Sequence, residues 1–147
     1  MSEDPIARRA HFLTFATADL DAARRFYIDG LGWEPLLDVA GEIVFFQVAG
    51  GFVLGLFQAE KFAADVAGAT ATAIGGTTIA HNVDSRDDVH TVVDRMAGFG
   101  GTVVTPPEDG AFGGIFHAIV RDPNGVVWEV AHNPGFSVDA DGTVHLG

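Results

Sequence analysis

The sequence predicts an α+β fold in which two βαβββ modules form a cleft. Three observations predict it: a strand, a helix and three strands follow one another in the first half, the same order restarts at Thr77, and glycines end the predicted helix of each half. With 147 residues, 48% of them hydrophobic, the chain can bury a core as one domain. We expect a single domain over residues 1–147, with modules at 10–67 and 77–134, a linker at 68–76 and a tail at 135–147.

The first module begins with a strand-like run at residues 11–17. A helix capped by Asp19 or Thr17 should follow, because apolar residues recur at helical spacing from Leu20 to Leu31. Turn signals then separate three strand-like runs, at 33–39, 42–48 and 52–57, before a short helix at 60–66.

The second module repeats this order. A strand at 77–83 precedes a helix capped by Ser85 or Asp84, and strands follow at 102–105, 112–120 and 126–132. Residues 106–114 are predicted to be a loop, either a lid or a simple connection, and the tail can add a hairpin with its turn at 139–142. Because each module alone would expose one face of its sheet, the two must associate, within one chain or between chains.

A tight turn is predicted at Asp122-Pro123-Asn124-Gly125, between two strand-like flanks. If Arg121 faces Val126 across the turn, Glu129 lies on a mostly apolar face. A carboxylate there must be hydrogen-bonded, ion-paired, metal-bound or facing a wet cavity. The predicted pairs are Val120 with Val127, Ala118 with Glu129, and Phe116 with Ala131.

Composition limits the possible partners. A net charge of −12 disfavours nucleic acid and anionic membranes, so we expect neither as a partner. The sequence has no cysteine, no signal-like start and no apolar run long enough to span a membrane, so we expect a cytoplasmic protein.

Several short motifs occur together: Phe26-Tyr27, Leu31-Gly32-Trp33, and Asp122-Pro123-Asn124-Gly125 leading into Trp128-Glu129. With the doubled βαβββ pattern, they make residues 10–134 resemble the vicinal oxygen chelate superfamily, which includes glyoxalase I, bleomycin-resistance proteins and extradiol dioxygenases. The resemblance implies a homodimer whose clefts combine modules of both chains. In metal-dependent members, four side chains meet in the cleft.

Carried over by position, the four metal-ligand positions fall near Phe12, Gly55, Thr78 and Glu129. Only Glu129 is a strong ligand, whereas catalytic metal sites usually have about three protein ligands. We therefore expect no metal cofactor. The alternative, a divalent Zn, Ni, Mn or Fe ion held with Glu129, requires a different strand register, because His11 lies one residue from the first position and faces the opposite side.

The tripeptide Ala-His-Asn occurs twice, at residues 80–82 and 131–133. His81 and His132 should lie close together and turn away from Glu129, whereas Asn82 returns to its face. The two histidines either form a ligand-binding pair or make structural hydrogen bonds, and we favour the structural role. Three further histidines are not favoured as site residues: His90 on a helix surface, His117 facing away from Glu129, and His145 in the tail.

Aromatic residues dominate the expected cleft face. One of Phe45 and Phe46 must lie on it, and we select Phe46; Trp128 should face the helices. The predicted function is metal-independent binding or sequestration of a hydrophobic or aromatic compound, which resembles that of bleomycin-resistance-type proteins; a cationic group on the compound could pair with Glu129. The alternative is a glyoxalase-like lyase or isomerase, or a dioxygenase, with Glu129 as the catalytic residue. The predicted ligand-binding residues are Phe12, Phe46, Phe57, Thr78, Asn82, Phe116 and Glu129.

Overall fold

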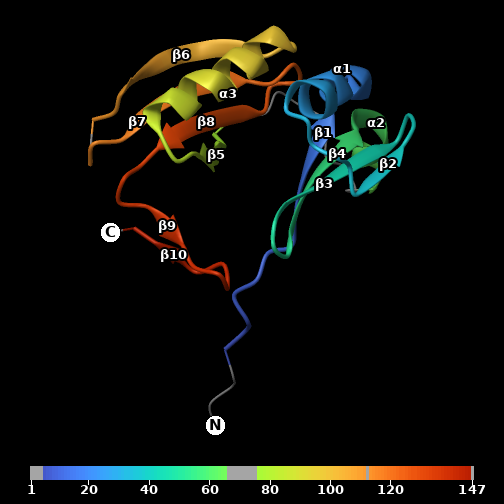
Figure 1. Cartoon of the computed structure of the whole chain (residues 1–147). Helices are drawn as coiled ribbons and strands as arrows, with labels where there is room; N and C mark the ends of the chain where they lie inside the picture. Colours follow the sequence, from blue (N-terminus) through green and yellow to red (C-terminus); the bar gives the residue numbers. More distant parts are fainter. Residues whose placement is uncertain (1–4, 66–75, 112, 147) are drawn as a thin grey trace.

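The computed structural model describes residues 5–65, 76–111 and 113–146, and it confirms the mixed α+β fold. Two four-stranded sheets, one from each half of the chain, have the strand orders β1-β4-β3-β2 and β5-β8-β7-β6 (Figure 1). In both, the first and last strands of the module are parallel neighbours and the other pairs are antiparallel. The shared topology matches the internal repeat of the sequence.

The described part of the first module contains seven elements. They are β1 (Phe12–Thr17), α1 (Leu20–Arg24), the π-helix η1 (Arg25–Gly30), β2 (Leu37–Val39), β3 (Ile43–Ala49), β4 (Phe52–Gln58) and α2 (Ala59–Asp65). The predicted linker at 68–76 lies outside the described residues except for Gly76.

The second module and the tail contain the remaining elements. They are β5 (Ile79–Asn82), α3 (Arg86–Gly98), β6 (Thr102–Asp109), β7 (Phe116–Arg121), β8 (Val127–His132), β9 (Ser137–Val138) and β10 (Val144–His145). The last two strands pair as the short hairpin expected in the tail, and α3 lies across one face of its sheet (Figure 1).

Helices α1 and α3 each begin with a side-chain cap. Asp19 accepts a hydrogen bond from the Ala22 amide at 2.9 Å, and Ser85 accepts one from the Asp88 amide at 3.0 Å. These bonds satisfy amide groups that the first helical turn leaves without partners. They confirm Asp19 and Ser85 as the caps.

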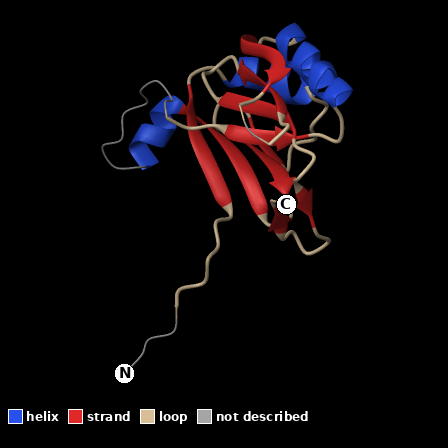
Figure 2. Ribbon diagram, turned by 90° about the vertical axis from the view of Figure 1, so that its left-hand side faces the viewer, coloured by secondary structure: helices blue, strands red, loops and turns tan. Residues whose placement is uncertain are grey.

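Helices α1, η1 and α3 lie together and share one core, whereas α2 lies apart from them (Figure 2). Tyr27 and Trp33 of the first module contact Trp128 of the second, with ring centroids 6.2 and 5.8 Å apart. Backbones also approach closely, since a Cβ at Gly30 would lie 2.7 Å from the Phe99 Cβ. The two modules therefore pack as a single body.

Two boundaries in the second module differ from the prediction. Strand β6 continues through Pro106 and Pro107 to Asp109, where a loop was expected, and β7 begins at Phe116 and not at residue 112. Prolines are tolerated in β6 because it is an edge strand, and its register shifts after Val103 and again after Thr105.

Candidate functional site

Glu129 lies on the face of the second sheet that points away from the helices. In the observed register it is opposite Ile119, so His117, two residues along β7, shares its face. The Nδ1 atom of His117 is 3.0 Å from the Oε2 atom of Glu129. The side chains are 24% and 36% exposed, which makes them a half-buried pair at the protein surface. The prediction that His117 faces away from Glu129 is wrong.

The turn at Asp122 explains this error. Arg121 pairs with Val127 and not with Val126, because the Asp122 carboxylate accepts hydrogen bonds from the Asn124 and Val126 amides, each at 2.8 Å. The connection is thus one residue longer than a four-residue turn. A one-residue slip exchanges the two faces of a strand relative to its partner, so every predicted pair in this hairpin is wrong.

The same carboxylate joins the two modules. Its Oδ2 atom accepts a hydrogen bond from the Tyr27 hydroxyl at 2.7 Å, and that hydroxyl accepts one from the Trp128 indole at 3.0 Å. Burial raises the pKa of Asp122, although the hydrogen bonds it accepts oppose that change. Burial, together with the charge of Asp122, raises the pKa of Tyr27 well above its usual value. This buried network fixes β8, and with it Glu129, against the first module.

A cavity of about 290 Å³ lies beside the His117–Glu129 pair. Its other lining residues are Gly110, Ala111 and Ile115, from the loop that precedes β7. Apart from the imidazole and the carboxylate, these residues offer only aliphatic carbon and backbone groups. The cavity therefore combines an apolar wall with one polar pair, as small-molecule sites commonly do.

A second cavity of about 290 Å³ lies on the corresponding face of the first module. Phe57 in this wall packs edge-on against Phe62, with ring centroids 6.4 Å apart, and the Phe45 ring lies 5.5 Å from that of Phe12. Phe12 is 59% exposed, so this end of the aromatic face is open to solvent in the single chain, whereas Phe45 and Phe57 are half-buried. The cavity is lined by Thr14, Ile43, Phe45, Phe57, Phe62 and Asp65 and shares no residue with the cavity at Glu129.

Two predicted cleft residues belong to the core instead. Phe46 is 2% exposed and packs against Tyr27 and Trp33, because Phe45, in register with Gly55, faces the cleft side. Phe116 is 6% exposed and lies under α3, where the Arg86 guanidinium is 4.0 Å from the centre of its ring. Their predicted place on the cleft face is therefore wrong. Trp128, 2% exposed, faces the helices as predicted.

The four positions considered for a metal do not provide a suitable set of ligands. Gly55 has no side chain, and a Cβ there would be 2.9 Å from the Thr14 hydroxyl and 3.1 Å from the Phe45 ring. Beside Glu129, β5 places Ala80 in register, with Thr78 just before the strand. Over residues 5–65, 76–111 and 113–146, no three His, Asp or Glu side chains are arranged to hold a metal ion. The residues present do not fit a catalytic metal.

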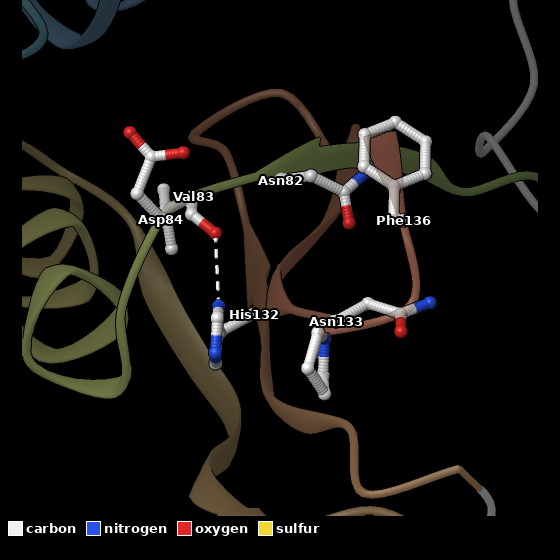
Figure 3. A pocket seen from close by; sticks show the side chains of 7 residues that line it. Asn82, Val83, Asp84, His132, Asn133 and Phe136 are labelled. Atoms are coloured by element: carbon white, nitrogen blue, oxygen red, sulfur yellow. Dashed lines mark hydrogen bonds between the residues drawn. The ribbon is translucent and has the colours of Figure 1, made fainter. Parts of the chain in front are cut away.

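The repeated Ala-His-Asn tripeptides lie at the ends of the parallel strands β5 and β8. His81 is in register with Val130, so it lies two positions from His132 along the sheet, and both turn away from Glu129 as predicted. His132 Nδ1 is 3.2 Å from the Val83 carbonyl, which supports a structural role (Figure 3). Asn82, in register with Ala131, lines a separate small cavity of about 190 Å³ with His132.

The doubled βαβββ topology places the chain in a class of folds built from two paired modules. Residues 9–130 match the model of the Glyoxalase/Bleomycin resistance protein/Dioxygenase superfamily, and the chain belongs to that family. No curated protein matches the sequence. Among the described residues, no helix is long and apolar enough to cross a membrane.

Solved structures agree with this family. A glyoxalase-related enzyme from Fulvimarina pelagi is 33% identical, with a TM-score of 0.86 over 94% of this chain and 97% of the other. A lactoylglutathione lyase from Agrobacterium tumefaciens is 26% identical, with a TM-score of 0.64 over 86% and 94%. A family enzyme from Burkholderia phytofirmans, 18% identical with a TM-score of 0.71 over 83% and 96%, supports the fold alone.

Proposed function

We propose that the protein binds and sequesters an aromatic small molecule without a metal, using the His117–Glu129 pair as the polar anchor of the site. The observation that carries this proposal is the 3.0 Å contact between His117 and Glu129 at the edge of an otherwise apolar cavity. A binding site needs few polar groups if these are well placed, whereas a metal site needs several ligands.

The pair indicates the chemistry of the ligand. An ionised Glu129 can only accept hydrogen bonds, so His117 donates from Nδ1, and its Nε2 atom, together with the second oxygen of Glu129, remains to accept from a ligand. A phenolic hydroxyl or a ring N–H supplies such a donor. The net charge of −12 further disfavours anionic ligands. Flat, neutral aromatic compounds with a hydrogen-bond donor therefore fit best.

A homodimer would complete the site. The aromatic face around Phe45 and the polar pair around Glu129 line separate cavities in the single chain. Both lie on the sheet faces opposite the core that α1, η1 and α3 share. Helix α2 contributes Phe62 and Asp65 to the cavity of the first module, where Phe12 is 59% exposed. We infer that a second copy brings the aromatic face of one chain opposite the His117–Glu129 pair of the other, as the family resemblance implies.

The second candidate is a proton-transfer enzyme of the lyase or isomerase type. It is favoured by the same contact, because a carboxylate that orients an imidazole is a common arrangement for a general base. In that reaction Nε2 of His117 would take a proton from a carbon next to a carbonyl; the C–H electron pair would form a C=C bond, and the π pair of the carbonyl would move to its oxygen to give an enolate. Glu129 would act as a positioning residue. A dioxygenase would need metal ligands that these residues do not provide.

The test uses 2-naphthol and its methyl ether, 2-methoxynaphthalene, in calorimetric titrations. We expect the wild type to bind 2-naphthol about tenfold more tightly than the ether, because the ether has no donor. His117→Phe should remove this preference while keeping the apolar wall. Glu60→Gln, which changes an exposed carboxylate on α2, serves as the control and should bind like the wild type.

Equal affinity of the wild type for both compounds, or a preference kept by His117→Phe, would contradict the proposal. The enzyme alternative is tested with 2-acetylnaphthalene in D₂O, by following the loss of its methyl signal in proton NMR. Exchange that requires His117 would favour catalysis over sequestration.

A further inference from the structure

A crevice of about 210 Å³ opens between the two modules, on the opposite side of β5 and β8 from Glu129. Residues from both modules line it, among them Trp33, Phe52, Ile79, Ala80, His81 and Trp128. It shares no residue with the cavity beside Glu129. We call it the inter-module crevice.

Aromatic and aliphatic side chains together form the walls of the inter-module crevice. Trp128 is 2% exposed and its indole N–H donates to the Tyr27 hydroxyl, so only the carbon surface of this ring forms part of the wall. Trp33 packs against it at 5.8 Å, and Phe52 comes from the start of β4. Such a surface favours stacking or edge contacts with a planar ring.

One side of the crevice is formed by the unpaired edge of strand β5. In the described sheet, β5 pairs with β8 alone, so its other edge is open. The Val83 amide donates to Ala131 of β8 at 2.8 Å. Since successive residues of a strand direct their backbone groups to alternate edges, His81 also faces β8 and Ala80 faces the open edge. The exposed Ala80 therefore presents an N–H donor and a C=O acceptor beside the crevice.

His81 adds a second polar group. Its imidazole lines the crevice and makes no hydrogen bond with any described residue. Burial lowers the pKa of His81, so the neutral ring, with one donor and one acceptor, is the favoured form. A ligand that supplies a hydrogen-bond partner for this half-buried imidazole therefore binds more favourably.

We propose that the inter-module crevice is a second small-molecule site, for a one- or two-ring aromatic lactam or carboxamide. The amide of the ligand pairs with the backbone N–H and C=O of Ala80, its ring lies against Trp33 and Phe52, and His81 contacts its polar edge. The volume of 210 Å³ is below the roughly 300–1,000 Å³ of drug-sized pockets, which limits the ligand to a small ring system.

The test is an NMR titration with 2-quinolone and N-methyl-2-quinolone. The chain has two tryptophans, and both line the crevice, so its two indole N–H signals report binding there directly. We expect 2-quinolone to shift both indole signals and the Ala80 and His81 amides. The N-methyl compound, which has no donor, should bind about tenfold more weakly.

Ala80→Pro removes the N–H at the open edge, where proline is tolerated, and should weaken 2-quinolone binding about tenfold. His81→Leu tests the imidazole without altering the strand, and it should also weaken binding. Glu129→Gln should leave the titration unchanged, which separates this site from the one beside His117.

Three results would overturn the inference: unshifted indole signals at millimolar 2-quinolone, equal binding of the N-methyl compound, or wild-type affinity in both His81→Leu and a folded Ala80→Pro. Dissociation of a dimer by Ala80→Pro would also overturn it, because the open edge would then be a protein interface.

Discussion

Tyr27→Phe is expected to remove the hydroxyl that connects the modules. This group donates to Asp122 and accepts from Trp128, and these two residues are only 3% and 2% exposed. Without it, a buried carboxylate oxygen and a buried indole N–H each lose a partner that water cannot replace. Each unsatisfied group costs about 1–3 kcal/mol, so we expect a loss of roughly 3 kcal/mol in the free energy of unfolding.

The loss should depend on pH. The hydrogen bond from Tyr27 lowers the pKa of Asp122, while burial raises it. Removing the bond raises the pKa of Asp122 in the folded state further. The Asp122 carboxyl of the folded variant therefore holds its proton more tightly than the same carboxyl of the unfolded chain does. The loss in the free energy of unfolding is then small at a pH where Asp122 is protonated, and it reaches its full value as the pH rises through the raised pKa of Asp122.

The assay is urea unfolding of the wild type and Tyr27→Phe, followed by circular dichroism at several pH values between about 4 and 7. The difference between the two proteins isolates the network from the other titrating groups. A difference below about 0.5 kcal/mol near neutral pH, or one that grows as the pH falls, would refute this reasoning.

Two further predictions concern the cleft faces. Phe116→Ala should lower the free energy of unfolding by about 3 kcal/mol in urea, because Phe116 is a core residue, and should leave the affinity for 2-naphthol unchanged. Phe45→Ala should change stability less and weaken 2-naphthol binding in calorimetry. If Phe116→Ala weakened binding and Phe45→Ala did not, Phe116 and not Phe45 would line the cleft. Gly55→Ala should displace the Thr14 and Phe45 side chains. We expect a loss of about 1–3 kcal/mol in the free energy of unfolding and weaker 2-naphthol binding. Wild-type stability and wild-type affinity would show that the contact at Gly55 is not tight.

The repeated module and the helix starts could be predicted because their signals are local. Asp19 and Ser85 are capping residues in front of helical patterns, and both cap their helices in the structure. The tail hairpin follows from a turn signal, and Gly142 donates to the Asp139 carbonyl as that signal implies. Local chemistry also explains why the order of elements was predicted correctly.

The site pair could not be predicted because it depends on the register of one hairpin. The Asp122 side chain bonds two amides of its own turn and lengthens the loop by one residue. This shift brings His117 to Glu129 and moves Phe116 into the core. An aspartate two residues before an asparagine can bond the backbone that follows it, and this was the only signal in the sequence for the longer turn.

The choice between Phe45 and Phe46 had no local signal either. Adjacent residues of a strand face opposite sides, and only pairing with β4 shows which one faces the core. Strand β6 was shortened in the prediction because two prolines usually end a strand. Here both prolines lie in the register shift between Thr105 and Glu108 of an edge strand, where neither is part of a ladder pair.

Calorimetric titration of Ni²⁺, Zn²⁺, Mn²⁺ and Fe²⁺ into metal-free, untagged protein tests whether the cleft binds its ligand without a metal. We expect no stoichiometric, tight binding of any of the four. In the part of the chain that the structure describes, His117 and Glu129 have no third metal ligand with them, and the Thr14 and Phe45 side chains occupy the space beside Gly55. Tight binding of one ion per chain that is lost in Glu129→Ala would contradict it and would identify the cleft as a metal site.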